Sequence, residues 1–181
     1  PSWSPNKNIV AFSETGQLQS GLGKREIYLL DTDGEAASAI VVDGSNFSAI
    51  WSPNGTSILY SIANPSNYDR AQLWYTGATG QSEGVGRKNL SVETWTDKCT
   101  FADESTVYCA IPRTGAKNSG VDSRLVTSFD DVYSINVTTG KKTLVAIPVI
   151  NMQINQLSIS DDQSLLYFTD SAGRLNYLRL K

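Results

Sequence analysis

Histidine is missing from this chain of 181 residues. It is the usual general base of serine and cysteine hydrolases and the commonest zinc ligand. Its absence removes the central residue of most hydrolytic and metal-dependent mechanisms, and no G-x-S-x-G motif marks a nucleophilic serine. We therefore expect a non-enzymatic chain with no catalytic residue, no cofactor and no metal ion.

Long charged runs and long apolar runs are lacking as well. The chain has 15 basic and 18 acidic residues, a net charge of −3, and no basic block, so we expect no nucleic-acid partner. Its apolar stretches have the length of strands and fall short of the ~18 residues of a membrane span. The sequence opens on Pro1-Ser2-Trp3 without Met or a signal peptide, so any targeting or anchoring segment would lie upstream.

Cysteine occurs only twice, at Cys99 and Cys109. The two positions flank a predicted hairpin turn, and adjacent strands bring Cα atoms within the ~4.4 to 6.8 Å that a disulfide requires. The spacing is not that of a C-x-x-C redox or zinc motif. We predict a disulfide, with two buried free thiols as the alternative. A disulfide would indicate an extracytoplasmic setting, in the periplasm or at the cell surface.

What the sequence does contain is a repeat. The segment WSPNGTSILYSI, residues 51–62, has counterparts that start at Trp3, Phe101 and Ile159, at spacings of 48, 50 and 58 residues. Each copy is an apolar strand end, a polar turn with Pro, Asn, Gly or Asp, and a second apolar strand, which is the pattern of a β-hairpin. A motif that recurs at this period indicates a repeat architecture.

The strands between these hairpins complete the repeat. A third strand ends in a turn in REIYLLDTDG (25–34), AQLWYTGATG (71–80) and DVYSINVTTG (131–140), and a short fourth strand follows each. Four-stranded antiparallel units of this length are typical of β-propeller blades, so we predict an all-β propeller of about four blades. The predicted blades are residues 1–46, 47–94, 95–150 and 151–181, with the last lacking its outer strand. A strand upstream of Pro1 would complete that blade, so we expect the C-terminal part of a longer protein, with a self-contained four-bladed ring as the alternative. A β-sandwich is the alternative, although it would not explain the repeat.

WSPNGTSILYSI and REIYLLDTDG together resemble the TolB-type propeller repeat, in which W-S-P-D-G precedes a short apolar strand and an I-Y-x-x-D-x-x-G segment follows. The resemblance covers essentially the whole chain, with Asn54 where the family usually has Asp, and with degenerate third and fourth copies, FADES and ISDDQ. It implies the propeller fold. It does not specify a function, since the family includes periplasmic scaffolds, non-catalytic domains of serine peptidases and surface proteins.

Candidate binding residues lie in the connections between the second and third strands. These connections span residues 14–24, 63–70 and 112–130 in the first three repeats, and only about 170–173 in the last. Long loops on one rim of a rigid scaffold are where binding residues concentrate. We predict a partner-binding rim formed by Tyr68, Arg70, Arg113, Lys117, Arg124 and Phe129. Such a rim suits a peptide or an anionic glycan, and a tolerated insertion without a partner is the alternative.

Two functions fit these features. The first is a binding or scaffold module for a protein or peptide partner in an extracytoplasmic setting. The second is the non-catalytic propeller domain of a larger enzyme, such as a prolyl-oligopeptidase-like serine peptidase, in which catalysis would reside outside this chain. The sequence specifies neither the partner nor an oligomeric state.

Overall fold

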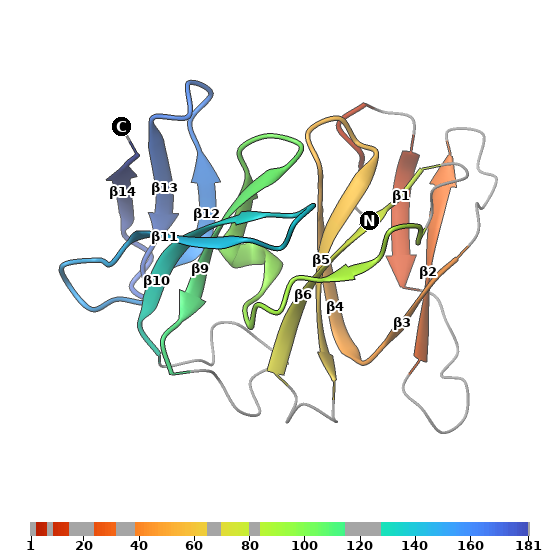
Figure 1. The fold of residues 1–181 in the computed structure, drawn as a ribbon, viewed down its shortest axis with the longest axis horizontal. Helices are drawn as coiled ribbons and strands as arrows, with labels where there is room; N and C mark the ends of the chain where they lie inside the picture. The colour runs from red at the N-terminus through yellow and green to blue at the C-terminus, as the bar shows by residue number, and fades with distance from the viewer. Residues whose placement is uncertain are drawn as a thin grey trace.

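The computed structural model describes residues 3–6, 9–14, 24–31, 39–64, 70–79, 84–114 and 128–180. They form four antiparallel sheets that follow one another along the long axis of the molecule (Figure 1). The predicted all-β fold with blade-like antiparallel sheets is confirmed. Among the described residues, no helix has the length and the hydropathy of a membrane span.

Each sheet is built from consecutive segments of the chain. Sheet I contains β1 (Ile9–Glu14), β2 (Lys24–Asp31) and β3 (Ile40–Asp43), and sheet II contains β4 (Ser45–Trp51), β5 (Ser57–Asn64), β6 (Arg70–Gly77) and β7 (Lys88–Asn89). After the short 3-10 helix η3 (Thr96–Lys98), sheet III contains β8 (Cys99–Phe101), β9 (Thr106–Pro112), β10 (Asp130–Asn136) and β11 (Lys142–Ala146). Sheet IV contains β12 (Asn155–Ile159), β13 (Leu165–Thr169) and β14 (Leu175–Arg179).

Sheet I differs from the expected four strands. Trp51 ends β4, the first strand of sheet II, whereas among the described residues no strand of sheet I corresponds to β4. Trp3, which occupies the equivalent position before its turn, is accordingly 62% exposed, while Trp51 is 8% exposed. The same sequence motif therefore produces a buried anchor in one sheet and an exposed side chain beside the other.

The hydrophobic core is divided among the spaces between adjacent sheets. Ile27, Leu29, Ile58 and Tyr60 belong to a cluster that joins sheets I and II. A second cluster joins sheets II and III, and a third joins sheet III to sheet IV. Because β-strand side chains alternate between the two faces, the near-continuous apolar strand β5 contributes to the first cluster with one face and to the second with the other.

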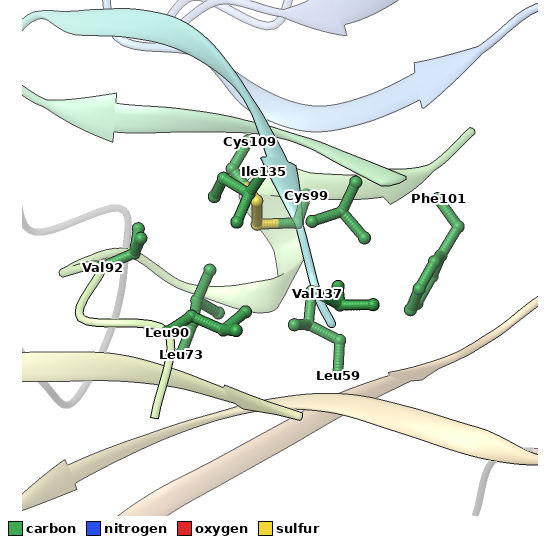
Figure 2. Packing of buried hydrophobic residues seen from close by; sticks show 10 residues of the cluster. Leu59, Leu73, Leu90, Val92, Cys99, Phe101, Cys109, Ile135 and Val137 are labelled. Atoms are coloured by element: carbon green, nitrogen blue, oxygen red, sulfur yellow. A yellow bond between two sulfur atoms is a disulfide. The ribbon is translucent and has the colours of Figure 1, made fainter. Parts of the chain in front are cut away.

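The disulfide between Cys99 and Cys109 lies within the second cluster (Figure 2). The two residues face each other across β8 and β9, with Cα atoms 4.2 Å apart. The Ala102 N–H donates to the Thr106 carbonyl, and the alternation of an antiparallel ladder then places the cysteines at a non-hydrogen-bonded pair, the kind in which Cα atoms approach most closely. The predicted pairing is present, and both cysteines are buried.

The polar turns of the repeat share one hydrogen-bond pattern. The Ser52 hydroxyl donates to Asn54 Oδ1 at 2.8 Å, and Asn54 Oδ1 also accepts from the Thr56 N–H. Asp162 takes the place of Asn54 in the last copy, where it accepts from the Ser160 hydroxyl and from Ser164. This closed Asx-type turn fixes the reversal between the first two strands. Asn stands at this position in the first two copies and Asp in the last two, because the side-chain oxygen of either residue can accept these hydrogen bonds.

Successive turns also bond to one another across the sheets. Asn6 Nδ2 donates to the Asn54 carbonyl at 2.9 Å, the Asn54 N–H donates to Glu104 Oε1 at 2.7 Å, and Gln163 Nε2 donates to the Ala102 carbonyl at 2.8 Å. Gly55, with φ of +69°, completes the contact, because a Cβ there would lie 2.7 Å from Asn6 Cγ. These turns form one edge of the molecule, which we call the turn edge.

The first prediction concerns the two equivalent tryptophans. We expect Trp51→Ala to lower the free energy of unfolding by about 3 to 5 kcal/mol, since it opens a cavity in the first cluster. Trp3→Ala should cost no more than about 0.5 kcal/mol, because that side chain is largely exposed. Denaturant unfolding of both variants measures the difference. Equal losses at the two sites would contradict the packing described above.

The second prediction concerns acid stability. Hydrogen bonds from Ser160, and then from Ser164, lower the pKa of Asp162 to about 2. The pKa of an unfolded Asp is about 3.9, so the ionised turn contributes stability above about pH 4 and loses that contribution as the pH falls toward about 2. We expect Asp162→Asn, which keeps the acceptor oxygen, to flatten the dependence of Tm on pH in this range. Asp161→Asn, which removes a charge one residue away, serves as the control for net charge.

Candidate functional site

In sheets II, III and IV, the edge opposite the turn edge holds the connections between the second and third strands. β5 ends and β6 begins there, as do β9 and β10, and β13 and β14 (Figure 1). Of the predicted rim residues, Arg70, Arg113 and Phe129 flank these connections at strand ends, while Tyr68, Lys117 and Arg124 lie outside the described residues. We call this edge the loop edge.

The arginines of the loop edge that the structure describes each face a carboxylate. Arg70 Nη1 lies 3.0 Å from Glu93 Oε2, and Arg113 Nη2 lies 2.7 Å from Asp131 Oδ1. Arg113 also donates to Asn151 Oδ1 at 2.8 Å, which joins sheet III to the segment leading into β12. The sequence predicted a rim of mixed basic and aromatic residues, but these pairs leave the described part of it with little excess positive charge.

Two adjoining hollows lie on the loop edge between sheets III and IV. The outer hollow has a volume of about 630 Å³ and is lined by Ser128, Phe129, Ile150, Asn151, Met152, Gln153, Asp170, Ser171, Arg174, Leu175 and Asn176. The inner hollow has a volume of about 340 Å³ and is lined by Asp97, Gln153, Asn155, Gln156, Thr169, Asp170, Ser171 and Gly173. Three residues line both, so the hollows form one groove, which we call the rim groove.

The outer end of the rim groove is apolar and open. Phe129 is 45%, Ile150 71% and Leu175 73% exposed, and Val149, next to Ile150, is fully exposed. Apolar side chains grouped in this way at the entrance of a hollow are characteristic of interaction sites. Of the three predicted rim residues that the structure describes, Phe129 is the one that lines this groove.

The floor of the rim groove contains a charged pair. Asp170 is buried and accepts hydrogen bonds from the backbone N–H groups of Ala172 and Arg174, and Arg174 Nε lies 2.7 Å from Asp170 Oδ2. The backbone hydrogen bond from Arg174 is the first cause that lowers the pKa of Asp170 below its usual range. Asp170 is therefore ionised at neutral pH and holds the Arg174 side chain in place, with most of that side chain exposed.

A second, fully buried ion pair lies beneath the groove. Lys98 Nζ is 2.7 Å from Asp130 Oδ2, and neither side chain is exposed. Asp130 Oδ2 also accepts the Ile154 N–H at 2.6 Å, and the Asp130 N–H donates to the Met152 carbonyl at 3.0 Å. The pair thus ties η3 and β10 to the segment that carries Gln153, one of the three residues shared by both hollows.

The third prediction tests this tie. Lys98→Met leaves the Asp130 carboxylate buried without its counter-charge, which should cost about 3 to 5 kcal/mol of stability. Lys98→Met combined with Asp130→Asn should recover most of that loss, since an Asn oxygen still accepts the Ile154 N–H. Denaturant unfolding of both variants checks this. If the double variant were no more stable than the single one, the buried charge would not be the cause.

The same variant has a defined pH dependence. Burial raises the pKa of Asp130, and the Lys98 ammonium opposes that rise. Once Lys98 is replaced, the carboxyl takes up a proton more readily in the folded state than in the unfolded state, so folding is favoured as the pH falls. The stability loss of Lys98→Met should therefore be smaller at about pH 5 than at about pH 8.

Most of the rim groove was not predicted from the sequence. Ile150, Asn151, Gln153 and Leu175 fell in segments that we had assigned to connections and strands. Two signals were available: the apolar run LVAIPVI at residues 144–150 has no strand-like alternation, and NMQINQ at 151–156 is unusually rich in carboxamides. Within the part of the chain that the structure describes, no group of three or more His, Cys, Asp or Glu residues could hold a metal ion.

No protein-family model and no curated protein matches this sequence. The fold is similar to TolB from Acinetobacter baumannii, with a TM-score of 0.59 and 14% identity over 99% of this chain and 42% of that one. A puromycin hydrolase gives a TM-score of 0.58 and 16% identity over 98% of this chain and 30% of that one. The tricorn protease gives a TM-score of 0.55 and 10% identity over 99% of this chain and 20% of that one. The chain spans less than half of each of these proteins, and its fold is similar to their β-propeller regions.

Proposed function

We propose that this chain is a non-catalytic propeller module of the TolB type that binds a protein partner through the rim groove. The observation that carries the proposal is the groove itself, with its exposed apolar mouth at Phe129, Ile150 and Leu175. It lies on the loop edge, where connections project from a rigid scaffold and binding residues are commonly found. Exposed apolar side chains grouped around a hollow mark a surface that a macromolecular partner can cover and remove from water.

The disulfide supports an extracytoplasmic location for this module. Disulfides persist in oxidising compartments and are rare in the cytosol. Cys99 and Cys109 are both buried in the second cluster, where a structural bond is more consistent with their surroundings than a catalytic one. The absence of histidine from the whole sequence supports a role in binding, because the commonest general base is not available.

A second candidate function is the propeller domain of a larger peptidase. The likeness to the tricorn protease and to a puromycin hydrolase favours it, since this chain matches 20% and 30% of their lengths. In that case the rim groove would receive a neighbouring domain or a substrate segment. A catalytic domain in a longer form of the protein would decide in favour of this candidate.

The fourth prediction tests partner binding in cells of the source organism. A photo-crosslinking residue, p-benzoylphenylalanine, replaces Ile150 at the groove mouth or, as a control, Val85. Val85 is 61% exposed and lies in the turn before β7, where its carbonyl accepts the Gly77 N–H of sheet II. We expect a discrete protein adduct after irradiation from position 150 and none from position 85. Equal labelling from both positions, or none from position 150, would contradict partner binding at the groove.

A further inference from the structure

Resting on the proposed function, we propose that the rim groove recognises an extended and uncharged stretch of polypeptide. Its main-chain amide groups bond to the carboxamides that line the groove, and one apolar side chain occupies the mouth. The proposal adds the chemical class of the ligand to the location of the site.

The lining of the rim groove is rich in carboxamides. Asn151, Gln153, Asn155, Gln156 and Asn176 all contribute to it. A carboxamide presents an acceptor oxygen and two N–H donors, so it can bond at once to the carbonyl and the N–H of a peptide group. Five such side chains along one groove match a chain of repeating amide groups better than they match a ligand with a single polar group.

One of these carboxamides has unused hydrogen-bonding capacity. Asn155 Oδ1 is buried and has no hydrogen-bond partner among the described residues. Burying an acceptor without a donor is unfavourable. A rotation of this side chain toward the inner hollow would let a ligand N–H satisfy the oxygen, so the inner end of the groove is suited to a hydrogen-bond donor.

The charges that the structure describes around the groove do not favour an ionic ligand. Arg174 is held by Asp170, and Arg113, which bonds to the lining residue Asn151, is held by Asp131. Asp97, at the inner end, is the remaining charged residue of the described lining. Because the two members of each ion pair largely cancel, the groove exerts little net electrostatic attraction on a charged ligand. Binding of the peptide should therefore depend only weakly on ionic strength.

The mouth specifies the side chain of the ligand. Phe129, Ile150 and Leu175 surround the outer hollow, and Met152 lies deeper in its lining. Phe129 is the one aromatic residue in the described lining of the groove, so there is no aromatic platform of the kind on which sugar rings or bases stack. An aliphatic or aromatic side chain from a peptide fits this surface, and its burial should contribute about 10- to 100-fold in affinity.

The fifth prediction is tested with a display library of random heptapeptides, selected on the immobilised chain. We expect enriched sequences to share an apolar residue without a shared charge. Synthetic copies should lose about 10-fold or more in affinity for Leu175→Ala and for Gln153→Ala, and should bind Val85→Ala as they bind the unaltered chain. Affinity should change by no more than about 2-fold between 50 and 500 mM NaCl, because an uncharged peptide forms no ion pair with the groove that salt could screen. Equal thermal melting of the variants confirms that they fold.

Three results would overturn the ligand class: no enrichment, binding that is indifferent to both groove variants, or enriched peptides that are charged and lose affinity steeply with salt. If any of these occurred while position 150 still gave an adduct in cells, partner binding at the groove would stand and only the peptide class would be wrong. If position 150 gave no adduct either, both proposals would fail together.

Discussion

Hydrogen bonds to the side-chain oxygen of an Asn or Asp close the repeating turn, and the register of the two strands that each turn joins depends on them. In the second and fourth copies, Ser52 bonds to Asn54 and Ser160 to Asp162. Each closed turn sets the register of the two strands that it joins, and in a strand a shift of one residue would move every apolar side chain to the opposite face. The turn therefore determines which residues enter the spaces between the sheets.

The contacts between successive turns extend this local constraint along the molecule. Asn6 of the first turn and Glu104 of the third turn both bond to the second turn, and Gln163 of the fourth turn bonds to the third. These bonds fix the turn edge from sheet to sheet. The loop edge is constrained differently, by the Lys98–Asp130 pair and by Arg113. A fixed turn edge leaves the loop edge able to carry connections of unequal length while the groove between sheets III and IV keeps its shape.

Much of the fold could be predicted because it is encoded locally and repeated. The WSPNG motif indicates the hairpin by its turn residues, and the position of Cys99 and Cys109 on either side of such a turn indicates their pairing. The rim groove could not be predicted in the same way. It forms where Phe129, Ile150 and Leu175 come together from two sheets, and their proximity depends on how the sheets pack. The sequence indicates the basic character of Arg113 but not its pairing with Asp131, which depends on the register of β9 and β10.

The division of the core into clusters between adjacent sheets has a consequence for cooperativity. Each cluster joins only two neighbouring sheets, so stability resembles a sum of terms for each sheet and each interface, as in a one-dimensional array. Sheets II and III each contribute residues to two of these clusters, whereas among the described residues sheets I and IV each contribute to one. Within the described residues, sheets II and III are therefore held from both faces, and the rim groove takes one of its walls from sheet III, which also carries the disulfide.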